Sequence, residues 1–225
     1  MSGRASRLSD NAIDHLPLRT SPPKQDRSRK TLKAILEATR YLVERKDFSA
    51  ISISEIVERS GTSNGSFYAR FPDKASLLLA LQLAAHREVI EELDARLNPE
   101  KWTHHDLRQT VEAMIPVLMH IPDKHLDVFK ATLVQSLRHP VLAANVDQIT
   151  QRKIALVARL VLSKKDEIIA DDAERLAFLA ARTVELLLQQ RRVRMFRRKP
   201  RERKYEKQFQ SELVEIYLRI LGCQV

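Results

Sequence analysis

Apolar residues along this chain recur at intervals of three and four over most of its length, which is the spacing of amphipathic helices. β-Branched runs are few and only four glycines are present, so we expect an all-α protein. Long helices are predicted from Asp26 through Val43 and over residues 73–97. Further helices are predicted over residues 104–120, 123–138, 141–162, 172–195 and 202–221, and Pro116 should kink or split the first of these.

Residues 52–74 are the most informative stretch, because their pattern predicts two short helices separated by a tight turn. Ser52 and Glu55 have the spacing of a capping box at the start of the first helix. Gly61 can adopt the positive φ that ends this helix. Ser63 can cap a second helix that we expect to run as far as Phe71. This pattern is typical of a helix-turn-helix.

The side chains of the second helix suit the major groove of DNA. Small hydroxyl and amide groups can reach base edges or phosphates, Gly65 permits a close backbone approach, and no acid is present. Lys74 is expected to open the following helix and to meet a backbone phosphate. Arg29 and Lys30 lie near the start of the first long helix, where cations oppose the helix dipole, so phosphates are natural partners for them.

The segment TSNGSFYARFPDK, which follows SISEIVERSG, resembles the signature of the TetR family of bacterial transcription regulators. The resemblance covers roughly residues 27–81 and implies a three-helix DNA-binding domain in which the second helix of the pair reads the DNA. It also implies phosphate contacts by Tyr68 and Lys74. Thr62 departs from the pattern, since valine is more usual there. The C-terminal half of such proteins has no sequence signature, so the resemblance names no effector.

Two interpretations of the aromatic residues stay open at this point. Phe67 and Phe71 are favoured as core anchors over base-stacking groups, because a domain this small must bury its aromatic residues. For Tyr68 we favour a phosphate contact over packing alone. The complete set expected at the DNA interface is Arg27, Arg29, Lys30, Ser52, Thr62, Ser63, Asn64, Gly65, Ser66, Phe67, Tyr68 and Lys74.

Composition indicates a polyanionic partner and argues against several other classes of function. The formal net charge of +10 favours nucleic acid first and an anionic membrane second. Cys223 is the sole cysteine, and the seven histidines match no metal-ligand spacing, so we expect no disulfide, metal or cofactor. We also expect a cytoplasmic protein without signal peptide or membrane span. No nucleophile–base pair or Gly-rich phosphate loop is present, so we expect no enzyme.

The sequence predicts three parts. Residues 1–25 should form a disordered arm, either without a partner or inserting arginines into a minor groove, and residues 26–74 the DNA-binding domain. Residues 73–97 should link this domain to a helical effector-binding and dimerisation domain at 98–225. We expect the effector pocket to be lined by Met114, Leu118, Phe129, Leu133 and Phe178, although for each residue taken alone a plain core position is favoured. A dimer interface is expected at Leu179, Thr183, Leu187, Leu213 and Tyr217.

The basic segment between the last two predicted helices, residues 191–207, holds ten arginines and lysines against two glutamates. It is either a solvated loop or a second site for a polyanion.

These features together predict a homodimeric repressor on a palindromic double-stranded DNA operator, released by a small-molecule effector. The alternative is a DNA-organising or partner-controlled DNA-binding protein of the same fold without a ligand.

Overall fold

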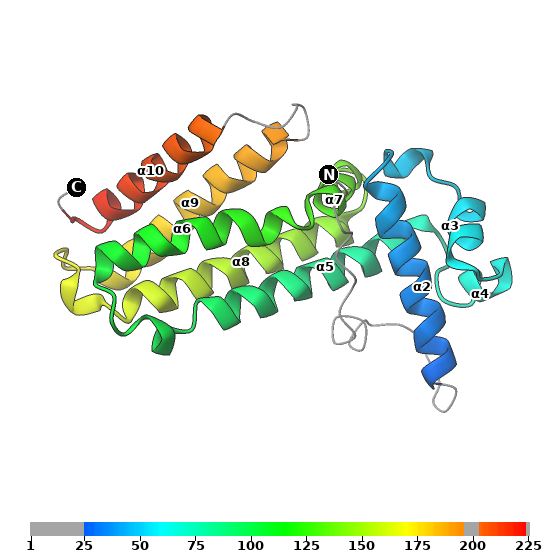
Figure 1. Cartoon of the computed structure of the whole chain (residues 1–225), viewed down its shortest axis with the longest axis horizontal. Coiled ribbons are helices and arrows are strands. Elements are labelled where there is room, and N and C mark those ends of the chain that lie inside the picture. The colour runs from blue at the N-terminus through cyan, green and yellow to red at the C-terminus, as the bar shows by residue number, and fades with distance from the viewer. Residues whose placement is uncertain (1–24, 196–202, 224–225) are drawn as a thin grey trace. The chain divides into compact units, whose positions relative to one another are not determined.

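The structure, a computed structural model, describes residues 25–195 and 203–223, and for residues 25–27 and 203–204 the backbone alone. These residues are helical and include no β-strand, which confirms the predicted fold class (Figure 1). The expected N-terminal arm and the central residues 196–202 of the basic segment lie outside the described residues. The chain divides into two compact units, each considered separately below.

The first unit comprises the described residues up to Glu88 together with His125–Val146. It contains α2 (Gln25–Val43), the 3-10 turn η1 (Phe48–Ala50), α3 (Ile53–Ser60), α4 (Asn64–Tyr68), most of α5 (Lys74–Arg96), α7 (Leu126–Ser136) and the start of α8 (Pro140–Leu162). Helix α2 packs against both α3 and α7. Its apolar stripe, which includes Ile35 and Leu36, is fully buried and joins one core with Ile56, Phe67 and Phe71.

The second helix of the helix-turn-helix is shorter than predicted. Helix α4 ends at Tyr68, and Ala69 and Arg70 continue as turns that bring Phe71 into the core. The expected continuation to Phe71 is therefore wrong. Phe67 and Phe71 are both fully buried, and the N–H of Arg70 bonds to the carbonyl of Phe67 at 2.9 Å, so the backbone tightens into a turn before Pro72 is reached.

The second unit comprises Val89–Lys124 and the described residues from Asp147 onward. It contains the end of α5, the 3-10 turn η2 (Pro99–Trp102), α6 (Leu107–Asp123), most of α8, the 3-10 turn η3 (Lys165–Glu167), α9 (Ala173–Met195) and α10 (Arg203–Ile220). Helix α6 starts three residues later than predicted, because Asp106 and Gln109 form a capping box there. It contains Pro116 and Pro122 and is not split, contrary to one of the two expected outcomes.

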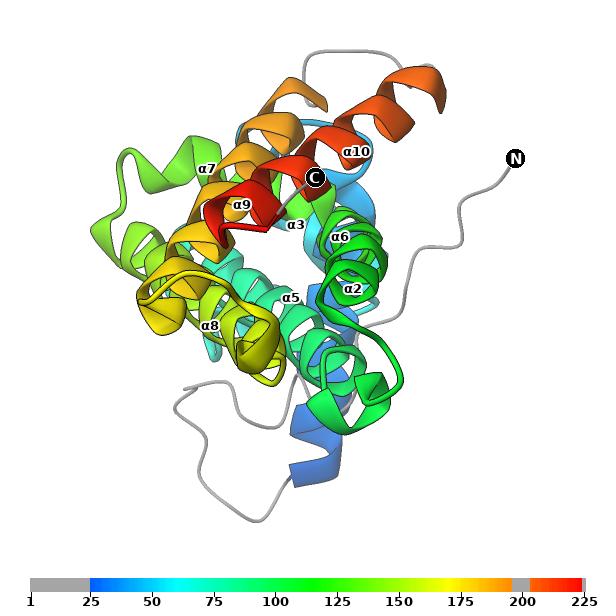
Figure 2. The same cartoon turned by 90° about the vertical axis from the view of Figure 1, so that its left-hand side faces the viewer.

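Helix α10 lies beside α9 and α6, as both views show (Figures 1 and 2). This packing changes the expected role of two residues that were assigned to a dimer interface. Leu213 and Tyr217 are fully buried within the unit, and the Tyr217 hydroxyl donates to the carbonyl of Ala177, 3.4 Å away. Both side chains are therefore core residues of the protomer, because α10 directs them toward α9 and α6.

Two groups of buried charges hold the second unit together. Glu185 on α9 accepts hydrogen bonds from Lys153 of α8 and, at 3.0 Å, from Arg192 of α9; all three side chains are buried. Arg191 donates to Asp123 of α6 at 2.8 Å and to Glu206 of α10 at 2.8 and 3.0 Å. Arg191 and Arg192 belong to the basic segment. Both are buried and paired with carboxylates within the second unit, so these two residues are not part of a solvated loop.

Helix α7 and the start of α8 cluster with the first unit, and the functional domains expected from the sequence stay a prediction. In the part of the chain that the structure describes, each helix is too short or too polar to cross a membrane.

The charge group around Glu185 generates a stability prediction. Glu185→Ala leaves Lys153 and Arg192 buried without their carboxylate, which should cost about 3–5 kcal/mol of unfolding free energy. The melting temperature followed by circular dichroism should fall by roughly 10 °C. Glu174→Ala, at an exposed position of the same helix, is the matched control and should change the melting temperature little. Equal melting temperatures for the two variants would contradict a structural role for this group.

Candidate nucleic-acid interface

The first helix of the motif, α3, begins with the predicted capping box. The Ser52 hydroxyl accepts from the backbone N–H of Glu55 at 3.2 Å, and the Ser52 N–H donates to the Glu55 carboxylate at 2.8 Å. Lys46, on the connection from α2, forms an ion pair with the same carboxylate. The hydrogen bond from Lys46, and then those from Ser52, lower the pKa of Glu55 to about 2. The carboxylate is thus ionised wherever the protein functions near neutral pH.

The turn between α3 and α4 is fixed by backbone geometry. Gly61 has a φ of 63°, as predicted, and its N–H bonds to the carbonyl of Glu58 at 3.2 Å. The N–H of Thr62 bonds to the carbonyl of Val57 at 3.1 Å, which completes a Schellman ending. The Thr62 hydroxyl pairs with that of Ser60 at 2.7 Å, so the polar group at this position has a local partner.

Helix α4 divides sharply into an outer and an inner face. The Ser63 hydroxyl caps it by accepting from the N–H of Ser66 at 3.1 Å. Phe67 is fully buried, which confirms its interpretation as a core anchor, and it contacts the ring of Tyr68 edge-on at 5.4 Å. The outer face is polar and consists of Ser63, Asn64, Gly65 and Tyr68, all exposed, with Ser66 partly so.

Tyr68 is the largest exposed group of this face. Its side chain is 55% exposed, and the residues that the structure describes provide no hydrogen-bond partner for its hydroxyl. The phenol is therefore positioned to donate to a ligand oxygen while its ring edge stays packed on Phe67.

Arg70 holds the end of the motif against α2 and was missed by the sequence analysis. Its guanidinium donates to the carbonyl of Ser66 at 2.9 Å, and to the carbonyl and hydroxyl of Ser28 at 3.2 Å each. Burial lowers the pKa of Arg70. No acidic neighbour in the sequence signals this role, because the partners are a serine and two backbone oxygens.

Lys74 has contacts that the sequence did not indicate. Its ammonium donates to the carbonyls of Phe48 and Ser49, at 2.9 and 3.3 Å, and to that of Ile51. Burial lowers its pKa. Lys74 therefore fastens the connection between α2 and α3 to the start of α5, and its phosphate contact stays a prediction.

The remaining predicted interface residues lie at the start of α2. Arg29 and Lys30 are exposed there, and Arg27 is placed only by its backbone. The structure brings this end of α2 close to α4 through the contacts of Arg70 with Ser28. The start of α2, which carries these cations, thus belongs to the same region of the first unit as α4.

Residues 35–81 match the profile described as "Bacterial regulatory proteins, tetR family". These residues are similar to the DNA-binding region of the tetR family. The match covers α3 and α4 entirely, the second half of α2 and the start of α5, and it includes the caps, turn and exposed face described above.

Two curated proteins with similar sequences come from Bacillus subtilis (strain 168). The uncharacterized HTH-type transcriptional regulator YvdT is 27% identical over 94 residues, which are 42% of this chain and 46% of YvdT. The uncharacterized HTH-type transcriptional regulator YxbF is 26% identical over 100 residues, 44% of this chain and 26% of YxbF. The chain thus matches less than half the length of either relative.

Solved structures share the fold over most of the chain. A transcriptional regulator from Cytophaga hutchinsonii ATCC 33406 aligns with a TM-score of 0.63 and 18% identity, over 85% of this chain and 96% of that one. A proposed TetR-family transcriptional regulator from Mesorhizobium loti MAFF303099 aligns with a TM-score of 0.67 and 20% identity, over 87% and 98%. At such identities the likeness shows the fold alone.

The residues expected to line an effector pocket are not gathered at one place within either unit. Met114, Leu118 and Phe178 belong to the second unit, and the first two are buried there. Phe129 and Leu133 belong to the first unit, where Leu133 is 40% exposed. Their role as pocket residues stays a prediction.

The lowered pKa of Glu55 predicts how acid affects the motif. Its folded-state pKa of about 2 lies below the ordinary value of 4.5, so the carboxylate stabilises the fold above pH 4.5. That contribution is lost as the pH falls toward 2. Glu55→Gln should therefore be less stable than the wild type near pH 6, and the two should converge near pH 2 in chemical denaturation. A stability difference independent of pH would contradict the ionic contribution of Glu55.

Proposed function

We propose that the protein is a homodimeric transcriptional repressor that binds a palindromic DNA operator through the outer face of α4 and the start of α2. The exposed polar face of α4, capped at Ser63 and fixed from behind by Phe67, carries this proposal. Such a face presents hydroxyl and amide groups without acidic side chains, which suits base edges and phosphates in a major groove. A small-molecule effector bound elsewhere would release the operator.

A dimer is supported by the outward face of α9. Leu179, Leu186 and Val193 are 42%, 58% and 36% exposed and are spaced seven residues apart, so they form one apolar stripe along the helix. Thr183 lies on the same stripe. Pairing this stripe with its copy would remove apolar surface from water and produce a two-fold axis. A two-fold axis requires recognition helices about 34–36 Å apart to engage successive major grooves, hence a palindrome.

In this proposal the effector acts through the spacing of the two recognition helices. A ligand that favours a dimer with its recognition helices spaced incorrectly lowers operator affinity. A coupling of about 1–3 kcal/mol changes that affinity roughly 5- to 150-fold.

The proposal is tested by footprinting the full chain on the DNA that flanks its own reading frame. A protected palindrome at moderate salt is the expected result. Diffuse, sequence-independent protection that vanishes with modest salt would overturn the operator proposal and favour a DNA-organising protein of the same fold.

Tyr68→Phe should weaken operator binding by roughly tenfold, because a hydrogen bond to a charged phosphate contributes about 1.5–3 kcal/mol. Base preference should not change, since a phosphate contact carries no sequence information. Mobility shifts on the operator and on single-base variants measure both quantities. Tyr205→Phe, on α10, is the matched control. A strong relaxation of sequence preference in Tyr68→Phe would contradict the assigned role.

Gly65→Ala tests how closely the backbone of α4 approaches DNA. A Cβ at this position would meet only the Ser63 hydroxyl, 3.9 Å away, so alanine fits the fold. The variant should gain about 0.5–1 kcal/mol of stability from helix propensity. It should lose roughly tenfold in operator affinity, since an extra methyl in a close contact costs about 1–3 kcal/mol. Unchanged affinity in a mobility shift would show that α4 does not approach DNA at Gly65.

A further inference from the structure

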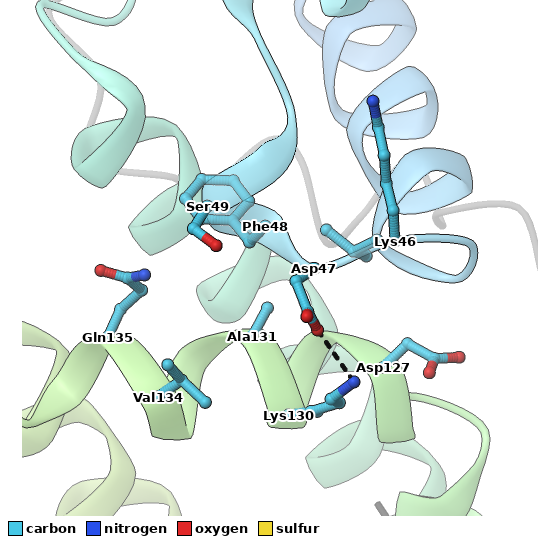
Figure 3. A pocket seen from close by; sticks show the side chains of 10 residues that line it. Lys46, Asp47, Phe48, Ser49, Asp127, Lys130, Ala131, Val134 and Gln135 are labelled. Atoms are coloured by element: carbon cyan, nitrogen blue, oxygen red, sulfur yellow. Dashed lines mark hydrogen bonds and ion pairs between the residues drawn. The ribbon is translucent and has the colours of Figure 1, made fainter.

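Helix α7 packs against α2 and the connection that follows it, and this α2–α7 interface is loosely filled in one place. A pocket of about 340 Å³ lies there, between residues 46–49 of the connection and α7 (Figure 3). The ion pair of Lys130 with Asp47, at 3.0 Å, joins the two walls of the pocket (Figure 3). These side chains are 41% and 70% exposed, and exposed ion pairs contribute little to stability. This part of the interface therefore holds α7 only weakly.

The start of α7 takes part in a buried cluster of three polar side chains from three helices. Arg40 lies on α2, Glu88 on α5 and His125 at the start of α7, with side chains 5%, 13% and 4% exposed. The Nη2 of Arg40 lies 3.1 Å from the Nδ1 of His125. The Nη1 of Arg40 and the Nε2 of His125 each lie 3.5 Å from the Oε2 of Glu88. The cluster thus joins α7 to α2 and α5 within the first unit.

The contact between Arg40 and His125 defines where the imidazole carries its proton. A guanidinium has hydrogen-bond donors only, so the Nδ1 of His125 must accept from Arg40 and bears no hydrogen. The hydrogen of the neutral ring is then on Nε2, which faces Glu88. A protonated ring carries a hydrogen on both nitrogens, so it cannot keep this bond with Arg40.

The ionisable groups around the cluster include both signs of charge. Those within one helical turn of its members are Glu37, Tyr41 and Glu44 of α2, His86, Arg87, Glu91 and Glu92 of α5, and Asp123, Lys124 and Asp127 around His125. His86 and His125 pack on the same ring, that of Phe129, with centroid distances of 5.4 and 6.3 Å. The nitrogens of His125 themselves contact Arg40 and Glu88, so these two groups act most directly on its protonation.

Protonation of His125 is unfavourable while the cluster is intact. An imidazolium would place a second cation against Arg40 in a buried site, where like charges repel strongly. Glu88 offsets the repulsion only in part, because the oxygen that faces the ring also faces Arg40. A ring separated from Arg40 resembles a free imidazole, which takes up a proton near about pH 6.5.

We propose that Arg40, Glu88 and His125 form a proton-sensitive latch, in which a proton from solvent breaks the hydrogen bond between His125 and Arg40 and releases α7 from α2. The closed latch binds this proton less readily than the open one. Its population is therefore highest above about pH 6.5 and falls as the pH is lowered. The carboxylate of Glu55, whose pKa is about 2, stays ionised over this range and does not share in the change.

The latch is placed to act on the helix-turn-helix. Helix α2 packs on α3, and its start is tied to α4 by the contacts of Arg70 with Ser28. Release of α7 removes one support of α2, so the DNA-binding arrangement becomes less populated and operator affinity falls in acid. This regulatory step rests on the proposed function, whereas the latch does not.

The first experiment locates the proton by nitrogen NMR of the imidazole rings in the full chain without DNA. At about pH 7.5 the ring of His125, identified by its loss in His125→Asn, should carry hydrogen on Nε2 alone. It should become doubly protonated as the pH is lowered toward about 5. A hydrogen on Nδ1 near neutral pH, or a ring that stays neutral in the folded chain at about pH 5, would overturn the proposal.

The second experiment follows the opening of α7 by backbone hydrogen exchange, corrected for the pH dependence of free amides. Protection of α7 should fall at least about fivefold between about pH 7.5 and 5.5 in the wild type. His125→Asn should show no such fall, because its amide oxygen can accept from Arg40 and takes up no proton. His104→Asn, at an exposed position of the second unit, is the matched control and should behave like the wild type. An equal fall in His125→Asn, or none in the wild type, would overturn the latch.

The third experiment removes the opposing cation and does not depend on folding of His125→Asn. In Arg40→Gln the repulsion is lost, so the NMR titration of His125 should move at least about one pH unit higher. Arg45→Gln, at an exposed position just after α2, is the matched control and should leave the titration in place. An unchanged titration in Arg40→Gln would overturn the role of Arg40.

The final experiment adds the operator at constant ionic strength. Between about pH 7.5 and 5.5 the wild type and His104→Asn should lose at least about fivefold more affinity than His125→Asn. Opening of α7 without this difference would overturn the regulatory step alone. A wild type that binds no operator at either pH would instead overturn the proposed function, while NMR and hydrogen exchange would still decide the latch.

Discussion

The helix-turn-helix depends on how the short connection between α2 and α3 is held. This backbone leaves the regular hydrogen bonding of an α-helix. The carbonyl of Phe48 accepts from the N–H of Ile51 at 3.2 Å, and the carbonyls of Phe48, Ser49 and Ile51 also accept from a side chain. The single ammonium of Lys74 supplies all three. Lys46 of the same connection neutralises the carboxylate that caps α3. The position of the helix-turn-helix thus rests on two lysines that belong to neither α3 nor α4.

Features of the motif that depend on neighbouring residues could be predicted from the sequence. The capping box of Ser52 and Glu55, the positive φ of Gly61 and the cap at Ser63 each involve residues at most three apart, so spacing alone defines them. The length of α4 could not be predicted, because the backbone tightens into a turn at Arg70, whose N–H bonds to the carbonyl of Phe67, and no residue pattern marks this position before Pro72. The contacts of Arg70 with Ser28 and of Lys74 with Phe48, Ser49 and Ile51 were equally hidden, since these partners are distant in sequence.

The same distinction between local patterns and contacts of distant residues explains which features of the second unit could be predicted. Helical periodicity located α9 and α10, yet it could not tell which apolar side chains face the protomer and which face outward. Leu213 and Tyr217 are buried by α6 and α9, whereas Leu179 stays exposed. The buried charge group of Glu185 was also unpredictable, because Lys153 and Glu185 are 32 positions apart. Pattern identifies an element, and packing decides what each of its faces does.

Helix α4 contains only five residues and is too short to be stable alone. Its conformation is enforced by groups that face inward or lie at its ends, namely Ser63, Phe67 and Arg70. The exposed residues contribute less to this conformation, namely Asn64, Gly65 and Tyr68. The outward positions can therefore be substituted without unfolding the motif, so the same scaffold is able to present different chemistry on its outer face.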